Sequence, residues 1–318
     1  MNTENVKKSE NTSIFDSHAL AQLGNFRLRV AQLATGMTFG EHNSVRSGIS
    51  TEFQDHRPWE TGNDPKLIDW RVFARSGKLF QRRYREEANT AFYFLLDYSP
   101  SMDFAGISGE DGTSSKKRLS KREYAQCTAA VLAYVALQQR DLVSFTALNG
   151  SSTVSLRLST GENHWVDSLD FLEKPPFPPM KKKSETEKTA RFSEVLNHLA
   201  SHCTRRGKIF IFSDLFDVET WGEIVPQLKL LLAKKHEIVL FHVLDADEWE
   251  FPYDSRTQFV SLENPSESLT SMPTEIRTEY LNAIQDWQKN ISEGAQTLGI
   301  QYIRIDTRTP ISETIRIS

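Results

Sequence analysis

The sequence has few of the features that mark secreted, membrane-spanning or nucleic-acid-binding proteins. Its 318 residues include two cysteines, Cys127 and Cys203, which are too few for a disulfide framework and favour a reducing compartment. No window approaches the ~20 apolar residues that a membrane-spanning helix needs, and the polar first residues lack the apolar core of a signal peptide. The formal net charge of −4 argues against a dedicated nucleic-acid binder. We therefore expect a soluble, cytoplasmic protein with no membrane insertion and no nucleic-acid partner.

Common catalytic signatures are also missing from the sequence. It contains no Gly-x-x-x-x-Gly-Lys-Ser/Thr phosphate loop and no Gly-x-Ser-x-Gly nucleophile elbow. A Ser/His/Asp triad is recognised by its geometry, so the sequence leaves that arrangement open. We expect binding rather than turnover, and hence a protein that is not an enzyme.

The pattern of apolar residues predicts an α/β protein in three parts. Residues 1–16 are polar and predicted to be disordered, residues 17–88 form a helix and a loop-rich extension with short strands, and residues 89–318 form the main domain. In the main domain, strands are predicted at residues 91–97, 142–148, 152–158, 208–213, 237–244 and 301–306, and helices at 120–139, 163–172, 192–203, 220–234 and 274–298. This alternation predicts a doubly wound, mostly parallel, Rossmann-type sheet flanked by helices. Asn149-Gly150 predicts a hairpin between the second and third strands.

The first strand of the main domain ends in a cluster of oxygen-bearing side chains. Residues 91–96 are apolar, as in a strand buried on both faces, and Asp97, Ser99 and Ser101 follow at alternating positions. Three hard oxygen ligands within five residues suit Mg²⁺ or Mn²⁺ better than zinc. A turn rich in Asp, Ser and Pro is the simpler explanation, and the motif alone does not decide between the two.

A second apolar strand ends in the same way, at Ser213-Asp214. If the two strands are neighbours where the strand order reverses, Asp97 and Asp214 lie at one edge of the sheet, where open α/β sheets bind ligands. The alternative is that each aspartate merely caps the helix that follows it.

Several long, ordered motifs resemble one known family. They are Gly48-Ile-Ser-Thr-Glu-Phe53, His56-Arg-Pro-Trp-Glu-Thr-Gly-Asn-Asp64, Ile68-Asp-Trp-Arg-Val-Phe-Ala-Arg75, Asp97-Tyr-Ser-Pro-Ser-Met102, Ser213-Asp-Leu-Phe-Asp217, His242-Val-Leu-Asp245 and Glu250-Phe-Pro252. With them, the chain resembles the domain of unknown function 58 (DUF58) family, a branch of the von Willebrand factor A-like proteins. The resemblance extends over residues 23–306.

This resemblance implies a von Willebrand A-type domain with a metal-ion-dependent adhesion site (MIDAS) that binds Mg²⁺ or Mn²⁺. It assigns the ligands Asp97, Ser99, Ser101 and Asp214. Where relatives carry a further threonine ligand this chain has Ala190, so Thr189, one residue earlier, is the candidate replacement. Ser193 or a water are alternatives, and without any of them the site has lost a ligand.

The function implied is a divalent-metal-assisted protein–protein interaction, in which a partner's Asp or Glu completes the metal shell. Relatives are associated with MoxR-type AAA+ ATPases, so the resemblance suggests an adaptor or partner of such an ATPase. Two alternatives stay open. One is a metal-free interaction scaffold with a degenerate site, and the other is a metal-dependent hydrolase in which Asp97 and Asp214 hold an activated water.

Overall fold

The computed structural model describes residues 25–40, 53–59, 68–84, 89–106, 118–150, 152–177, 192–218, 220–263 and 266–317. The tail predicted at residues 1–16 and the candidate ligand Thr189, with Ala190, lie outside these ranges. The chain divides into two compact units, one formed by Met1–Thr38 with Thr90–Ser318 and the other by Phe39–Asn89.

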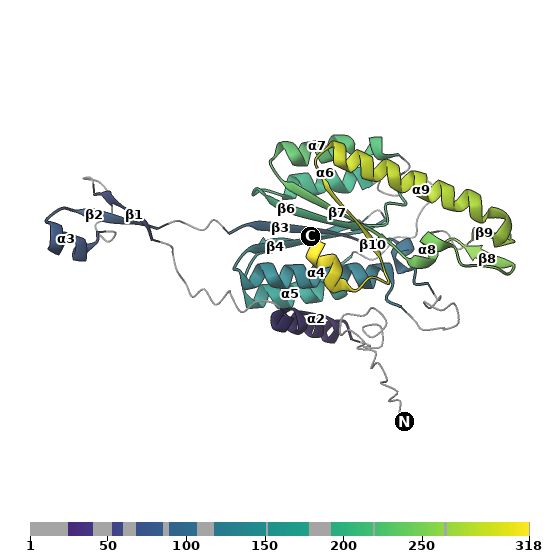
Figure 1. Ribbon diagram of the computed structural model, residues 1–318, viewed down its shortest axis with the longest axis horizontal. Coiled ribbons are helices and arrows are strands. Elements are labelled where there is room, and N and C mark those ends of the chain that lie inside the picture. The colour runs from purple at the N-terminus through teal and green to yellow at the C-terminus, as the bar shows by residue number, and fades with distance from the viewer. Residues whose placement is uncertain are drawn as a thin grey trace, which may run out of the picture. The chain divides into compact units, whose positions relative to one another are not determined.

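The larger unit is built on a six-stranded sheet with the strand order β10-β7-β6-β3-β4-β5 (Figure 1). Its strands are β3 (Ala91–Asp97), β4 (Leu142–Asn149), β5 (Ser152–Ser159), β6 (Gly207–Ser213), β7 (Glu237–Leu244) and β10 (Gln301–Asp306). β5 is antiparallel to β4, while all other neighbours run parallel. The predicted fold class, a mostly parallel α/β sheet, is confirmed, and so is the hairpin at Asn149-Gly150.

The strand order places two strand ends side by side at the point where the chain changes direction across the sheet. From β3 the chain proceeds outward through β4 to β5, and it then returns to β6 on the other side of β3. β3 and β6 are paired in register from Ala91 opposite Gly207 to Leu96 opposite Phe212. Asp97 and Asp214 therefore follow neighbouring strands at one edge, as predicted, and this edge is the usual ligand-binding position of such sheets.

Helices cover both faces of the sheet (Figure 1). One face packs against α4 (Lys121–Gln138) and α5 (Glu162–Glu173), and residues of α2 (Phe26–Gly40) and α10 (Ile311–Ile317) belong to the same hydrophobic cluster. The opposite face packs against α6 (Phe192–His202), α7 (Val225–Ala233) and α9 (Pro273–Thr297). With both faces covered, the central strands are buried on both sides, which explains their uninterrupted apolar sequences.

Stacked aromatic rings connect the central strands on the face covered by α4. Phe94 of β3 stacks on Phe145 of β4 and on Phe210 of β6, with ring centroids 5.0 and 5.1 Å apart. Phe212 stacks on Phe241 of β7 at 4.4 Å. Such offset stacks add to the stabilisation from area burial, so they favour the register that aligns the strand ends.

Several short elements have no counterpart in the sequence prediction. In the larger unit they are η2 (Pro100–Asp103), α8 (Ala246–Glu250), the hairpin of β8 (Thr257–Val260) and β9 (Ser268–Ser271), and α10. The smaller unit adds α3 (Trp70–Ser76), which also has no counterpart. Its antiparallel pair β1 (Phe53–Pro58) and β2 (Phe80–Tyr84) lies where short strands were predicted. Elements of four to seven residues are too short for hydrophobic periodicity to reveal them.

One predicted helix, at residues 220–234, is divided in the structure. It consists of η3 (Trp221–Glu223) followed by α7, with a proline at the start of α7. Proline lacks the N–H that a continuous helix would use there, so the helix restarts at that point. In the described part of the chain, no helix has the length and apolarity required to cross a bilayer.

The close contact between the starts of β3 and β6 gives a first prediction. A Cβ atom added at Gly207 would overlap the backbone carbonyl of Ala91, whereas one added at Gly222 would lie 4.0 Å from its nearest neighbour. We expect Gly207→Ala to lower the free energy of unfolding by about 1–3 kcal/mol, as overpacking does, and Gly222→Ala to leave it unchanged. Urea unfolding of both variants measures this, and equal stabilities would contradict the strand contact.

Candidate functional site

The two predicted carboxylates lie buried at the carboxyl edge of the sheet. Asp97 Oδ1 accepts a hydrogen bond from the backbone N–H of Ser99 at 2.8 Å, and its Oδ2 accepts one from Ser213 Oγ at 2.6 Å. Asp214, which follows β6, accepts the backbone N–H of Phe216 on Oδ1 at 3.2 Å. Each aspartate thus fixes the turn that follows its strand.

The two predicted hydroxyls belong to the turn directly after β3. Pro100 opens η2, and this short helix places Ser99 Oγ 3.1 Å from Ser101 Oγ. The backbone N–H of Ser101 donates to Glu263 Oε1 at 2.9 Å, so a carboxylate from a distant part of the chain already lies at this edge. The structure therefore brings Asp97, Ser99 and Ser101 together beside the strand that precedes Asp214.

A buried ammonium group, absent from the sequence prediction, lies at the same edge. Lys121 Nζ is 2.8 Å from Asp214 Oδ2 and 2.7 Å from Glu248 Oε1, and the lysine is 0% exposed. The ring of Phe216 lies over the ammonium, with its centroid 4.6 Å from Nζ. The group that most directly neutralises Asp214 is therefore a side chain of the protein itself.

The beginning of α4 explains why Lys121 is held in this place. Ser120 and Glu123 form a capping box, in which each side chain accepts the other residue's backbone N–H at 3.1 and 3.0 Å. The backbone N–H of Lys121 itself donates to the carbonyl of Phe104 at 3.1 Å. A lysine in the first turn of a helix is unfavourable beside the positive end of the helix dipole. Its two carboxylate partners offset that cost.

The pKa shifts at this edge follow from burial and from neighbouring charges. Burial, and then the nearby charge of Asp214, raise the pKa of Asp97 to about 7. Burial alone would lower the pKa of Lys121, but attraction to Asp214 and Glu248 outweighs it, so the pKa is raised and the ammonium stays charged.

A second buried ion pair lies next to this one. The guanidinium of Arg118 donates to Asp245 Oδ1 and to Asp247 Oδ1, each at 2.7 Å, and all three side chains are buried. Thr307 Oγ1 donates to the other oxygen of Asp245 at 2.6 Å. Asp245 caps α8, the helix that carries Glu248, so this pair positions one of the two partners of Lys121.

The buried ring of His242, in β7, forms a hydrogen bond to the backbone of Asp214. Its Nε2 lies 3.2 Å from the carbonyl oxygen of Asp214, to which it donates, and its Nδ1 lies 2.8 Å from the hydroxyl of Tyr302. Burial lowers the pKa of His242 to about 4, so the ring is neutral at pH 7.

The oxygen donors at this edge are of the type that Mg²⁺ and Mn²⁺ prefer, but a cation of the protein itself, Lys121, already lies against Asp214. Every oxygen of Asp97 and Asp214 already accepts a protein hydrogen bond, and the donor to Asp214 Oδ2 is a cation. Among the described residues no three His, Cys, Asp or Glu side chains form a metal site, and the predicted site itself has two carboxylates and otherwise hydroxyls. The metal expected from the sequence stays an untested prediction.

Sequence reasoning missed Lys121, Glu248 and Phe216. Lys121 carried a signal, since it lies inside a capping-box pattern that opens the helix after Asp97. Glu248 belongs to a short helix without periodicity, and Phe216 lies in a loop, so only the fold brings them to this edge.

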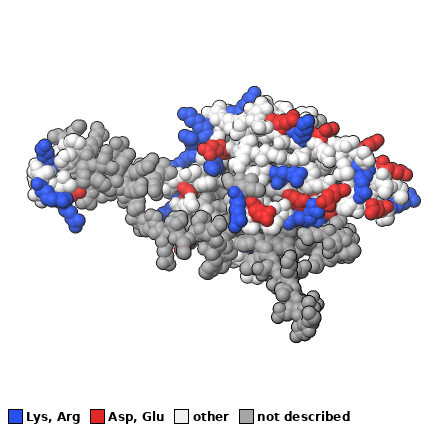
Figure 2. Space-filling model, in the orientation of Figure 1, with Lys and Arg blue, Asp and Glu red and all other residues white. Residues whose placement is uncertain are grey.

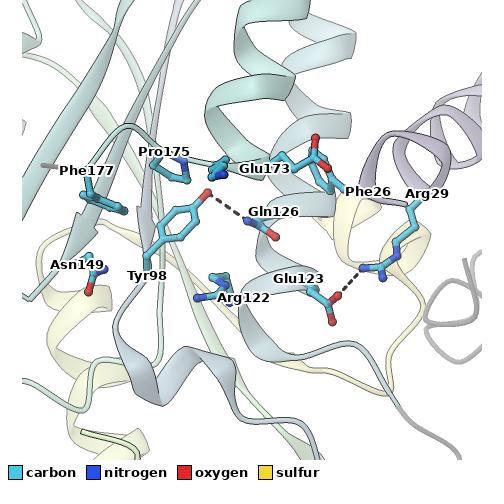
Figure 3. A pocket seen from close by; sticks show the side chains of 11 residues that line it. Phe26, Arg29, Tyr98, Arg122, Glu123, Gln126, Asn149, Glu173, Pro175 and Phe177 are labelled. Atoms are coloured by element: carbon cyan, nitrogen blue, oxygen red, sulfur yellow. Dashed lines mark hydrogen bonds and ion pairs between the residues drawn. The ribbon is translucent and has the colours of Figure 1, made fainter. Parts of the chain in front are cut away.

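A cavity of about 440 Å³ lies next to the candidate site, between α2 and α4 (Figure 3). It is lined by Phe26, Tyr98, Gln126, Phe177 and other residues. Tyr98 Oη and Gln126 Nε2 both donate to the carbonyl of Leu172, at 2.7 and 2.6 Å. These polar groups therefore hold the cavity wall together.

Comparison with known proteins gives a family match and distant relatives. The model of a family described as "Protein of unknown function DUF58" matches residues 55–290. Uncharacterized proteins of Mycobacterium bovis and of Mycobacterium tuberculosis are each 24% identical to this chain over 239 residues, which is 75% of this chain and 69% of theirs.

Two solved structures show weaker similarity. The VWA domain of SpRpn10 is 11% identical, with a TM-score of 0.40, over 73% of this chain and 96% of that one. The PilB minor pilin from Streptococcus sanguinis is 10% identical, with a TM-score of 0.35, over 76% and 64% of the two chains.

Removing the buried ammonium gives a second prediction. Lys121→Met would leave Asp214 and Glu248 buried without their cation, and breaking a buried pair in this way costs about 3–5 kcal/mol. Lys208→Met removes a surface lysine 3.8 Å from Glu237 and is expected to cost at most about 1 kcal/mol. Chemical denaturation of both variants tests the difference, and a loss for Lys121→Met as small as the control's would contradict the buried pair.

The neutral ring of His242 predicts a pH dependence of stability. The unfolded imidazole takes up a proton near pH 6.5, but the folded one does so only near pH 4. The unfolded state binds more protons in this window, so stability is lost as the pH falls from 6.5 to 4, by on the order of 3 kcal/mol.

The raised pKa of Asp97 has the opposite effect on stability, which it increases as the pH falls. The variant His242→Gln isolates the contribution of His242, because the native protein and the variant share the effect of Asp97. We expect the stability difference between native protein and variant to shrink as the pH falls from 6.5 to 4. Denaturant titrations at several pH values measure it, and a constant difference would refute a neutral, buried His242.

Proposed function

This chain belongs to the DUF58 family, and we propose from its candidate site that it is a protein-interaction module. The two mycobacterial relatives are themselves described as uncharacterized. In this proposal the partner binds at the carboxyl edge of β3 and β6, where Phe216, Ser101 and the buried ion pair of Lys121 lie. The partner is a MoxR-type AAA+ ATPase, as the family resemblance of the sequence suggests.

The observation that carries the proposal is an exposed aromatic ring at this edge. Phe216 is 45% exposed although it follows a buried strand, and its ring stacks on Trp287 with centroids 5.3 Å apart. Trp287 and the ammonium of Lys121 hold the ring in one position. A rigid, partly exposed aromatic side chain is the kind of residue that dominates binding energy at protein interfaces.

The polar groups beside Phe216 favour a partner with an acidic side chain. The N–H of Ser101 binds the carboxylate of the chain's own Glu263, which is exposed. A partner's Asp or Glu competes for the same donor. The metal-assisted interaction predicted from the sequence also places the partner's Asp or Glu at this edge.

The hydrolase alternative has less support. It requires Asp97 and Asp214 to hold an activated water between them. The oxygens of both carboxylates accept protein hydrogen bonds, and Asp214 is paired with an ammonium. On the described part of the face in Figure 2, basic and acidic side chains lie side by side.

The fourth prediction tests the exposed ring against a matched control. Phe216→Ser removes the proposed anchor, and Leu230→Ser removes an equally exposed (45%) apolar side chain from α7. We expect Phe216→Ser to weaken binding to a MoxR-type ATPase from the same organism by about tenfold or more, and Leu230→Ser to leave it unchanged.

Calorimetry with the full-length chain measures the affinities, after circular dichroism has confirmed that both variants fold. Equal weakening by both variants, or by Leu230→Ser alone, would refute this edge as the interface. Failure of the native chain to bind the ATPase would refute that partner.

A further inference from the structure

We propose that the ammonium of Lys121 is the resident cation of the carboxyl edge and takes the place of a divalent metal ion there. This inference builds on the proposed function, because it states that the interaction edge forms without Mg²⁺, Mn²⁺ or Ca²⁺. It also changes how the two predicted carboxylates are understood: Asp214 is the partner of an internal lysine and not a metal ligand.

The position of the ammonium supports the proposal. Lys121 Nζ lies 2.8 Å from Asp214 Oδ2, the carboxylate that the sequence assigned to a metal. Glu248 Oε1, 2.7 Å away on the other side, completes a carboxylate–ammonium–carboxylate arrangement. A divalent ion bound to Asp214 would lie within a few ångströms of the Lys121 ammonium. Repulsion between these two positive charges is strong in a buried environment.

The surroundings keep the ammonium in place. The capping box of α4 fixes its backbone, and the rings of Phe216 and Phe104 lie 4.6 and 5.9 Å from Nζ. Aromatic faces attract a cation and exclude water, so they stabilise the buried position of the Lys121 ammonium. A lysine that merely approached a metal site from outside would keep some contact with solvent, but Lys121 has none.

Asp97 and the two hydroxyls have roles that need no metal. Asp97 accepts the N–H of Ser99 and the hydroxyl of Ser213, and so connects the turn after β3 to the end of β6. The Ser99 and Ser101 hydroxyls lie 3.1 Å apart and bond to each other. The residues that resemble metal ligands therefore form a hydrogen-bonded edge.

The test measures thermal stability of the full-length chain in EDTA and in saturating Mg²⁺, Mn²⁺ or Ca²⁺. We expect the same Tm in all four conditions for the native protein. An increase in Tm with any of these ions that is abolished in Asp97→Ala would overturn the proposal, because ion binding to the folded state alone must raise Tm.

A second variant tests whether the ammonium occupies the metal's place. Lys121→Met/Glu248→Gln removes the cation together with one carboxylate, which limits the loss of stability, and leaves Asp214 available to an ion. We expect this variant to gain a Tm increase of about 5 °C or more with Mg²⁺ or Mn²⁺ at a hundredfold excess over the dissociation constant. Lys208→Met, a surface control, gains none.

Absence of any gain in the double variant would show that Lys121 does not stand in the metal's place and would overturn the proposal. Neither measurement involves a partner protein. Metal binding by the native chain would thus refute the lysine assignment and leave the interaction role standing, whereas failure of the binding test with Phe216→Ser would refute only the interaction role.

Discussion

The carboxyl edge of the sheet depends on one buried charge, the ammonium of Lys121. A buried charge is tolerated only with close partners, and three parts of the chain provide this pairing. α4 carries the lysine, Asp214 directly follows β6, and α8 carries Glu248. Phe216 shields the ammonium and is itself the exposed ring of the proposed interface. The buried ion pair and the proposed binding surface therefore share Phe216, so a change in one affects the other.

Much of the fold was predictable because long buried strands and amphipathic helices leave a clear pattern in the sequence. The apolar residues 91–96 and 209–212 predicted β3 and β6, and the matching acidic ends correctly predicted that Asp97 and Asp214 share an edge. Asn149-Gly150 likewise identified the antiparallel hairpin. The short helix α8 and the β8–β9 hairpin escaped prediction, since tertiary contacts rather than local periodicity maintain them.

The sequence predicted the position of the candidate site but not the buried lysine, Glu248 and Phe216 that lie there. The motif Asp97-x-Ser99-x-Ser101 lies at this edge, but it does not reveal which cation pairs with Asp214. The answer lies 24 residues further on, in a lysine whose side chain direction depends on the capping of α4. A sequence pattern shows which oxygen-bearing side chains are present, whereas the charged groups that lie beside them depend on how the chain folds.

The most direct test of this account is a crystal structure of the native protein grown with an excess of Mn²⁺, with anomalous scattering recorded at the carboxyl edge. We expect no anomalous peak between Asp97 and Asp214, and Lys121 Nζ within hydrogen-bond distance of Asp214 and Glu248. A manganese peak at Ser99, Ser101 and Asp214, with Lys121 displaced, would contradict the central claim that the protein supplies its own cation.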